Sequence, residues 1–279
     1  MRADGLSAPA GLHDPRVVEA FLQGAVGPDM GYFRGGGRRI SDLAHRVRSA
    51  DLARAMLQHA SDPVQTAYVW GWVTHLLADV AIHPLINRAT GELIDGRLNR
   101  VVVAAESPAS HLRVELGLDA YFQTHHSVSC GARFGTAVPR ARMRFLSAAY
   151  QLTYGDGPGL DDLFGAQLAM LRLAPLLLAL SRVFGEVHRG LRRCVEPAAL
   201  RQAGSAEGEA GAEGALAIFQ SFLTPVTPRP WLVREVGSVV RGFADTFLEH
   251  YHSRLRELAN YDLDTGCLAS GQEKDARAA

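Results

Sequence analysis

Apolar and polar residues follow one another along this chain with the period of α-helices. Within residues 67–87, an otherwise apolar segment, three polar side chains recur every four positions, His75, Asp79 and His83. At about 3.6 residues per turn, such side chains lie on one face of a helix. The sequence shows neither an alternating run typical of a strand nor an internal repeat of about 20 to 50 residues. The pattern predicts an all-α protein.

Capping signals mark where the main helices begin. Asp62-Pro63 and Ser107-Pro108 each place a capping side chain before a proline that suits the first helical turn. The glycines and proline within 24–29 end a short helix expected over 17–23. Further helices are expected over 41–45, 49–60, 160–193, 215–223 and 232–260, and a turn over 261–266.

Pro84 should interrupt the helix that carries the polar ladder. Proline has no amide hydrogen to donate, and it disfavours helical geometry at the residue before it. We therefore expect the helix that starts at Pro63 to stop or kink at His83. Residues 85–103 are then a connection.

Length and composition indicate one self-sufficient domain. The chain has 279 residues, 47% of them hydrophobic, which is ample for a core. We expect a loose lead-in over 1–15, a single α-helical domain over 16–270 with a flexible loop near 201–214, and a disordered tail over 271–279. The loop is predicted from its low complexity and lack of large apolar groups.

The net charge and the first residues of the chain indicate which partners and which cellular compartment to expect. The net charge is zero, so we expect no stable nucleic-acid partner, while transient membrane contact is allowed. The first residues contain no apolar core of a secretory signal, which predicts a cytoplasmic location; a start further upstream would allow secretion. Three widely spaced cysteines fit neither a disulfide framework nor a cysteine-based zinc site.

A second ladder of polar residues suggests a metal centre. His111, Glu115 and Asp119 are again four apart, so two helices packed side by side would enclose both ladders. Imidazole and carboxylate ligands without thiolate suit zinc best, although manganese or iron would accept them. Six or seven ligands exceed one tetrahedral site and imply at least two ions, the arrangement typical of phosphoesterases. The alternative is that each ladder pairs internally along a solvated helix face.

The order and spacing of several motifs resemble the zinc-dependent phospholipase C family, which shares its all-α fold with S1/P1-type nucleases. The resemblance covers about residues 18–125. It rests on the motifs Gly24-Ala25-x-x-Pro28-Asp29, His45, Gly71-Trp72-x-x-His75-x-x-x-Asp79-x-x-x-His83-Pro84 and His111-x-x-x-Glu115.

The resemblance implies a multi-helix bundle around a zinc cluster of two or three ions, which hydrolyses a phosphodiester by attack of metal-activated water. It assigns the first ion to Asp29, His45, His75 and Asp79, and the second to His83, His111 and Glu115. Asp79 would bridge to the third ion. Asp29 is also the candidate to orient or deprotonate the attacking water.

Two departures from the family pattern concern the third ion and the substrate. Secreted members complete the third site with the amino group of an N-terminal tryptophan and a nearby histidine, whereas this chain has no early tryptophan. Three alternatives follow for the third ion: it is absent, it is weakly held, or a residue such as Asp119 binds it. Members that cleave phosphatidylcholine tend to have an aromatic residue after the motif aspartate, where this chain has Met30.

We expect a zinc-dependent phosphodiester hydrolase that acts on a phospholipid or another phosphodiester. Two alternatives stay open. One is a single-strand nuclease with the same cluster, against which the neutral charge argues. The other is a metal-stabilised structural or binding protein without turnover.

Overall fold

The computed structural model describes residues 14–33, 37–125, 140–191, 221 and 224–269. These form helices almost throughout, which confirms the all-α prediction. The loop expected near 201–214, the tail over 271–279 and most of the helix expected over 215–223 lie outside the described residues. The elements in chain order are α1 (Pro15–Ala25), η1 (Gly27–Tyr32), α2 (Arg38–Arg46), α3 (Ser49–His59), α4 (Pro63–Asp95), α5 (Pro108–His125), α6 (Arg140–Tyr154), α7 (Leu160–Leu191), α10 (Pro230–Ser253), β1 (Tyr261–Asp262) and β2 (Cys267–Leu268).

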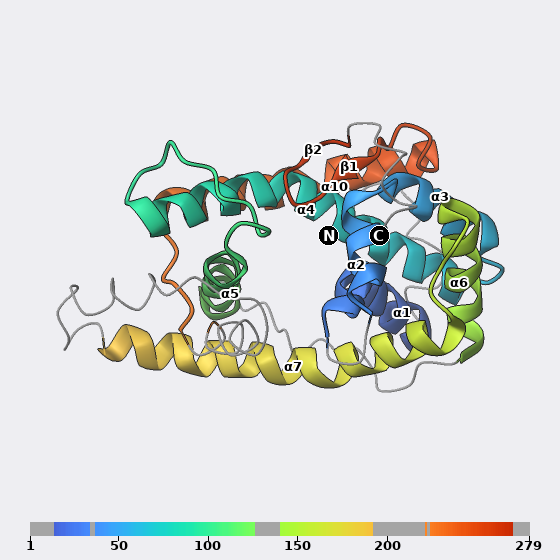
Figure 1. Ribbon diagram of the computed structural model, residues 1–279, viewed down its shortest axis with the longest axis horizontal. Coiled ribbons are helices and arrows are strands. Elements are labelled where there is room, and N and C mark those ends of the chain that lie inside the picture. Colours follow the sequence, from blue (N-terminus) through green and yellow to red (C-terminus); the bar gives the residue numbers. More distant parts are fainter. Residues whose placement is uncertain (1–13, 34–36, 126–139, 192–220, 222–223, 270–279) are drawn as a thin grey trace.

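The longest helix, α4, organises the molecule. Figure 1 shows α4 along one long side and α7 along the other, with α5 between them and seen end-on. Helix α4 begins where predicted, because the Asp62 side chain accepts a hydrogen bond from the Gln65 amide at 2.8 Å. It is long and apolar enough to cross a membrane, a test that core helices also pass. Here α4 packs against α1, α5 and α10, as a core helix does.

Of the stop or kink expected at His83, the stop is wrong. Helix α4 continues through Pro84 to Asp95, so residues 85–95 are helical and the connection begins only at Gly96, whose φ is +73°. Proline removes one hydrogen bond, the one that its amide would have donated to the Val80 carbonyl. Packing on both sides of Pro84 outweighs this loss, because each half of α4 contributes to a separate apolar cluster.

The two apolar clusters meet at the middle of α4. The larger one surrounds its first half and includes Tyr68, Trp72 and Leu76, all less than 3% exposed. The smaller one packs the second half of α4 against α5 and α10, through Ile86, Ala89, Val114, Leu118, Leu232 and Val236. The polar ladder of α4 therefore lies at the junction of the two clusters.

Helices α1 and α4 approach closely at two glycines. A Cβ atom on Gly24 would lie 2.0 Å from the Tyr68 carbonyl oxygen, and one on Gly71 would lie 1.9 Å from the Phe21 carbonyl oxygen. Backbone atoms cannot yield as a flexible side chain can. This spacing brings η1, which directly follows α1, against the same helix.

We predict that Gly71→Ala destabilises the protein because its methyl group forces α1 away from α4. The expected loss in the free energy of unfolding is about 1–3 kcal/mol, measured by urea denaturation. Gly242→Ala in α10 is the control, since a Cβ there meets nothing within 4 Å. It should stabilise the helix by up to about 1 kcal/mol. Equal stabilities of the two variants would contradict the close approach.

Candidate metal centre

Four elements deliver the residues of the predicted centre to one place. One face of α4 presents the three residues of its ladder, while η1, α2 and α5 supply the others. The seven residues that the structure brings together are Asp29, His45, His75, Asp79, His83, His111 and Glu115. The remaining member of the second ladder, Asp119, is exposed and belongs to neither of the groups described below.

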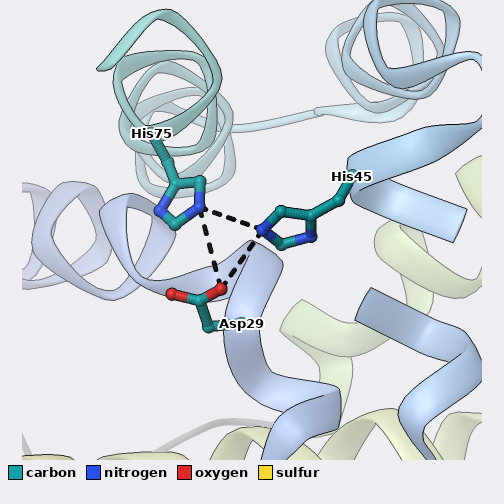
Figure 2. A group of neighbouring side chains, drawn as sticks. All are labelled: Asp29, His45 and His75. Carbon is teal, nitrogen blue, oxygen red and sulfur yellow. Dashed lines mark hydrogen bonds and ion pairs between the residues drawn. The ribbon is translucent and has the colours of Figure 1, made fainter. Parts of the chain in front are cut away.

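The first group consists of Asp29, His45 and His75, whose ligand atoms lie within 4.8 Å of one another. Figure 2 shows the two imidazole rings and the carboxylate pointing toward a common centre. Oδ1 of Asp29 lies 3.2 Å from Nε2 of His45 and 3.8 Å from Nε2 of His75. The two Nε2 atoms are 3.3 Å apart. Such convergence of lone-pair donors is what a cation requires.

The second group consists of His83, His111 and Glu115, again within 4.8 Å of one another. Oε1 of Glu115 lies 3.1 Å from Nε2 of each histidine. The group joins two helices, because His83 comes from α4 and the other two residues come from α5. Each group therefore combines two imidazoles with one carboxylate.

Asp79 lies between the two groups. Its Oδ2 is 3.0 Å from Nε2 of His75 and 3.6 Å from Nε2 of His45, whereas its Oδ1 is 4.0 Å from Nε2 of His83. Each oxygen thus faces a different group. The carboxylate is 15% exposed, so its charge is largely removed from water.

Backbone carbonyls hold three of the histidine rings in one orientation. Nδ1 of His45 donates to the Ser41 carbonyl at 2.8 Å, Nδ1 of His75 to Ala25 at 3.0 Å, and Nδ1 of His83 to Leu263 at 2.6 Å. A carbonyl only accepts, so this pattern assigns the proton to Nδ1. Each neutral ring then directs the lone pair of Nε2 into the centre, as in metal-ligating histidines. The donor set and its orientation fit zinc.

Burial and mutual charges shift the pKa values of these groups. Burial disfavours the charged form of His75, but the charges of Asp79 and Asp29 outweigh it and raise its pKa to about 9. At His83, too, burial lowers the pKa, but Asp79 and Glu115 outweigh this effect and raise the pKa to about 10. Burial would raise the pKa of Asp79, yet His75 and His83 lower it to about 2. Without metal, protonated histidines therefore supply the positive charge that the carboxylates require.

Sequence reasoning missed the groups that orient the rings. The carbonyls of Ser41, Ala25 and Leu263 are backbone atoms, and any residue type carries them. The one local signal was the turn expected over 261–266, which is confirmed between β1 and β2. Nothing in the sequence connects this turn with the metal ligands, because Leu263 lies 180 positions from His83.

The fold and the centre together define a class, an all-α protein with clustered histidine and carboxylate ligands. The chain belongs to the zinc-dependent phospholipase C family, whose model matches residues 11–152, just over half of the chain. All seven residues of the centre lie within the matched region. No curated protein and no solved structure matches the chain.

We predict a characteristic pH dependence for the metal-free protein. His75 and His83 have raised pKa values, so their contribution to stability is fully present below about pH 6.5, their ordinary pKa, and is lost as the pH rises through 9 and 10. Asp79 has a lowered pKa, so its contribution is lost as the pH falls from about 4 toward 2. Urea denaturation in the presence of a chelator measures both limbs.

The control for this measurement is His59→Gln, which replaces an exposed histidine outside the centre. It should leave the alkaline limb intact, whereas His75→Gln should reduce it. An alkaline limb that is the same in both variants would contradict the assignment to the centre.

Proposed function

We propose that this protein is a zinc-dependent hydrolase of phosphodiesters, with a phospholipid as the favoured substrate class. The observation that carries the proposal is the convergence of four imidazole rings and three carboxylates into two groups that share Asp79. Membership of the zinc-dependent phospholipase C family supports both the metal and the substrate class.

We propose one zinc ion for each group, with Asp79 facing both. Imidazole and carboxylate donors without thiolate are the ligands of hydrolytic zinc sites. A third ion stays a prediction from the resemblance, which assigns Asp79 to it. Bound ions would lower the pKa of a water molecule and hold the oxygens of the phosphate during an in-line displacement.

The exposed carboxylates indicate the open side of the centre. Asp29 is 40% exposed and Glu115 is 32% exposed, whereas the side chain of His45 is 3% exposed. A phosphodiester can therefore approach over η1 and α5. The buried histidines form the floor of the centre.

We propose that Asp29 takes the proton of the attacking water. Figure 2 shows one carboxylate oxygen directed at His45 and His75 and the other directed away from them. The second oxygen can accept a hydrogen bond from water on the open side and take its proton. Hydrolysis forms a bond from the water oxygen to phosphorus and breaks the bond to one ester oxygen, which leaves with a proton.

We predict that Asp79→Asn removes bound metal and activity together. The variant loses the charge that both groups share, so metal content should fall below that of the wild type and kcat/KM should drop by at least about 100-fold. Metal analysis of the purified protein and turnover of short-chain phospholipids, phospholipid vesicles and single-stranded nucleic acid provide the measurements.

The matched control is Asp95→Asn at the end of the same helix, where the carboxylate pairs with Arg100 in solvent. It should retain metal and activity. Cleavage of nucleic acid alone would favour the nuclease alternative, and tight metal without hydrolysis of any substrate would favour the binding protein. A wild-type protein without stoichiometric metal would refute the proposal.

We also predict that Asp29→Asn separates proton transfer from metal binding. The amide keeps an oxygen that can face a metal, but it cannot take a proton, so kcat should fall by about 10²–10⁴-fold. Metal content should change less than in Asp79→Asn. The kcat of the metal-loaded variant is decisive. An unchanged kcat at wild-type metal content would exclude Asp29 as the base.

A further inference from the structure

A short hairpin near the end of the chain lies across the two groups of the centre. The antiparallel pair β1 and β2 encloses a turn, and Figure 1 shows it beside α4 and α2. The Leu263 carbonyl accepts from Nδ1 of His83 at 2.6 Å, while the Leu263 amide donates to the His45 carbonyl at 2.8 Å. One backbone position therefore touches a histidine of each group.

Further contacts clamp the hairpin to the same two helices. Nδ2 of Asn87 donates to the Asp264 carbonyl at 2.7 Å, one turn beyond His83 on α4. The Asp264 carboxylate pairs with Arg46 at 2.7 Å, directly after His45 on α2. Asn87 is 1% exposed and Asp264 is 8% exposed. Both residues are buried, and polar contacts between buried groups contribute more to holding the hairpin in place than contacts on a solvated surface.

The hairpin packs where α4 lacks one backbone hydrogen bond, at Pro84. Because Pro84 has no amide hydrogen, the Val80 carbonyl has lost its usual helical donor. Gly266 packs directly over this carbonyl with a φ of +69°, and a Cβ there would lie 2.6 Å from the Val80 oxygen and 2.8 Å from Cγ of Pro84. Only glycine suits both the left-handed backbone and the close approach. The hairpin thus packs against the turn of α4 between Val80 and Pro84.

We propose that the hairpin Tyr261–Leu268 is the positioning element of the metal centre. The Leu263 carbonyl keeps the proton of His83 on Nδ1 and so leaves Nε2 free to bind a cation, while the Leu263 amide ties the backbone of His45 to the same point. The hairpin thereby sets the geometry between the two groups. This inference rests on one part of the proposed function, namely that the two groups hold metal. It assigns a role to a segment that lies well beyond the matched residues 11–152.

The test compares two glycines that share a conformation but differ in surroundings. Gly266→Ala should push the hairpin off α4, whereas Gly155→Ala adds the same methyl group at a φ of +75° with nothing within 4 Å. Both variants carry the same backbone strain. The full-length protein is titrated with zinc against a chelator, and with cobalt, whose visible absorption reports the ligand geometry.

We predict that Gly266→Ala weakens metal binding about 10–100-fold, the range for losing a partner of a ligating histidine. The cobalt spectrum should change, and NMR of the His83 ring nitrogens should show that the Nδ1 proton is no longer held. Gly155→Ala should bind metal as the wild type does. Unchanged affinity and spectra in Gly266→Ala, or equal losses in both variants, would overturn the proposal.

A second pair of variants decides the matter should Gly266→Ala fail to fold. Asn87→Ala removes the anchor of the Asp264 carbonyl, and Thr90→Ala is its control, a buried residue of α4 whose hydroxyl donates to the Ile86 carbonyl of the same helix. Weaker metal binding in Asn87→Ala alone supports the proposal, and equal affinities refute it. These readouts are independent of turnover. A wild-type protein that binds metal but hydrolyses nothing would refute the proposed function and leave the positioning role intact.

Discussion

The burial of Asp79 is the constraint on which the centre depends. A carboxylate on an apolar helix loses its hydration, and this cost is met only by nearby positive charge or by hydrogen-bond donors. Helix α4 supplies His75 and His83 one turn to either side, and each of these largely buried rings also needs a partner for its other nitrogen. The surrounding elements meet that requirement. They bring backbone carbonyls to Nδ1 of the rings and further metal ligands to the side of Nε2.

The packing of α1 on α4 explains how a residue of η1 reaches this helix. The glycine contacts bring the two backbones together, and η1 then follows at once along the same surface. A Cβ on Gly27 would lie 2.7 Å from the Tyr68 hydroxyl and 2.8 Å from the Trp72 ring, so η1 also lies directly on α4. Asp29, two residues later, is thereby held beside His75. The same approach places the Ala25 carbonyl on Nδ1 of that histidine.

The part of the chain beyond the family match contributes to the same centre. The matched residues contain all seven side chains of the two groups, yet the ring of His83 is oriented by a carbonyl from the hairpin. The continuity of α4 makes this possible. A helix that ended at His83 would offer no surface to Gly266 and no Asn87 one turn further on. The proline that suggested a helix end is instead the position on which the hairpin packs.

The sequence by itself determined the helical class, the start of α4 and the residues of the centre, because these depend on local signals: a period of four, a capping pair, and side chains with known ligand chemistry. It determined the family through the same motifs. Only the tertiary structure decided the course of the chain at Pro84, the carbonyls that orient three of the histidine rings, and the hairpin that contacts a histidine of each group. The reason is physical. The cost of one missing helical hydrogen bond is local, whereas the packing that outweighs it comes from α5, α10 and the hairpin, and backbone carbonyls leave no mark in the residue types that carry them.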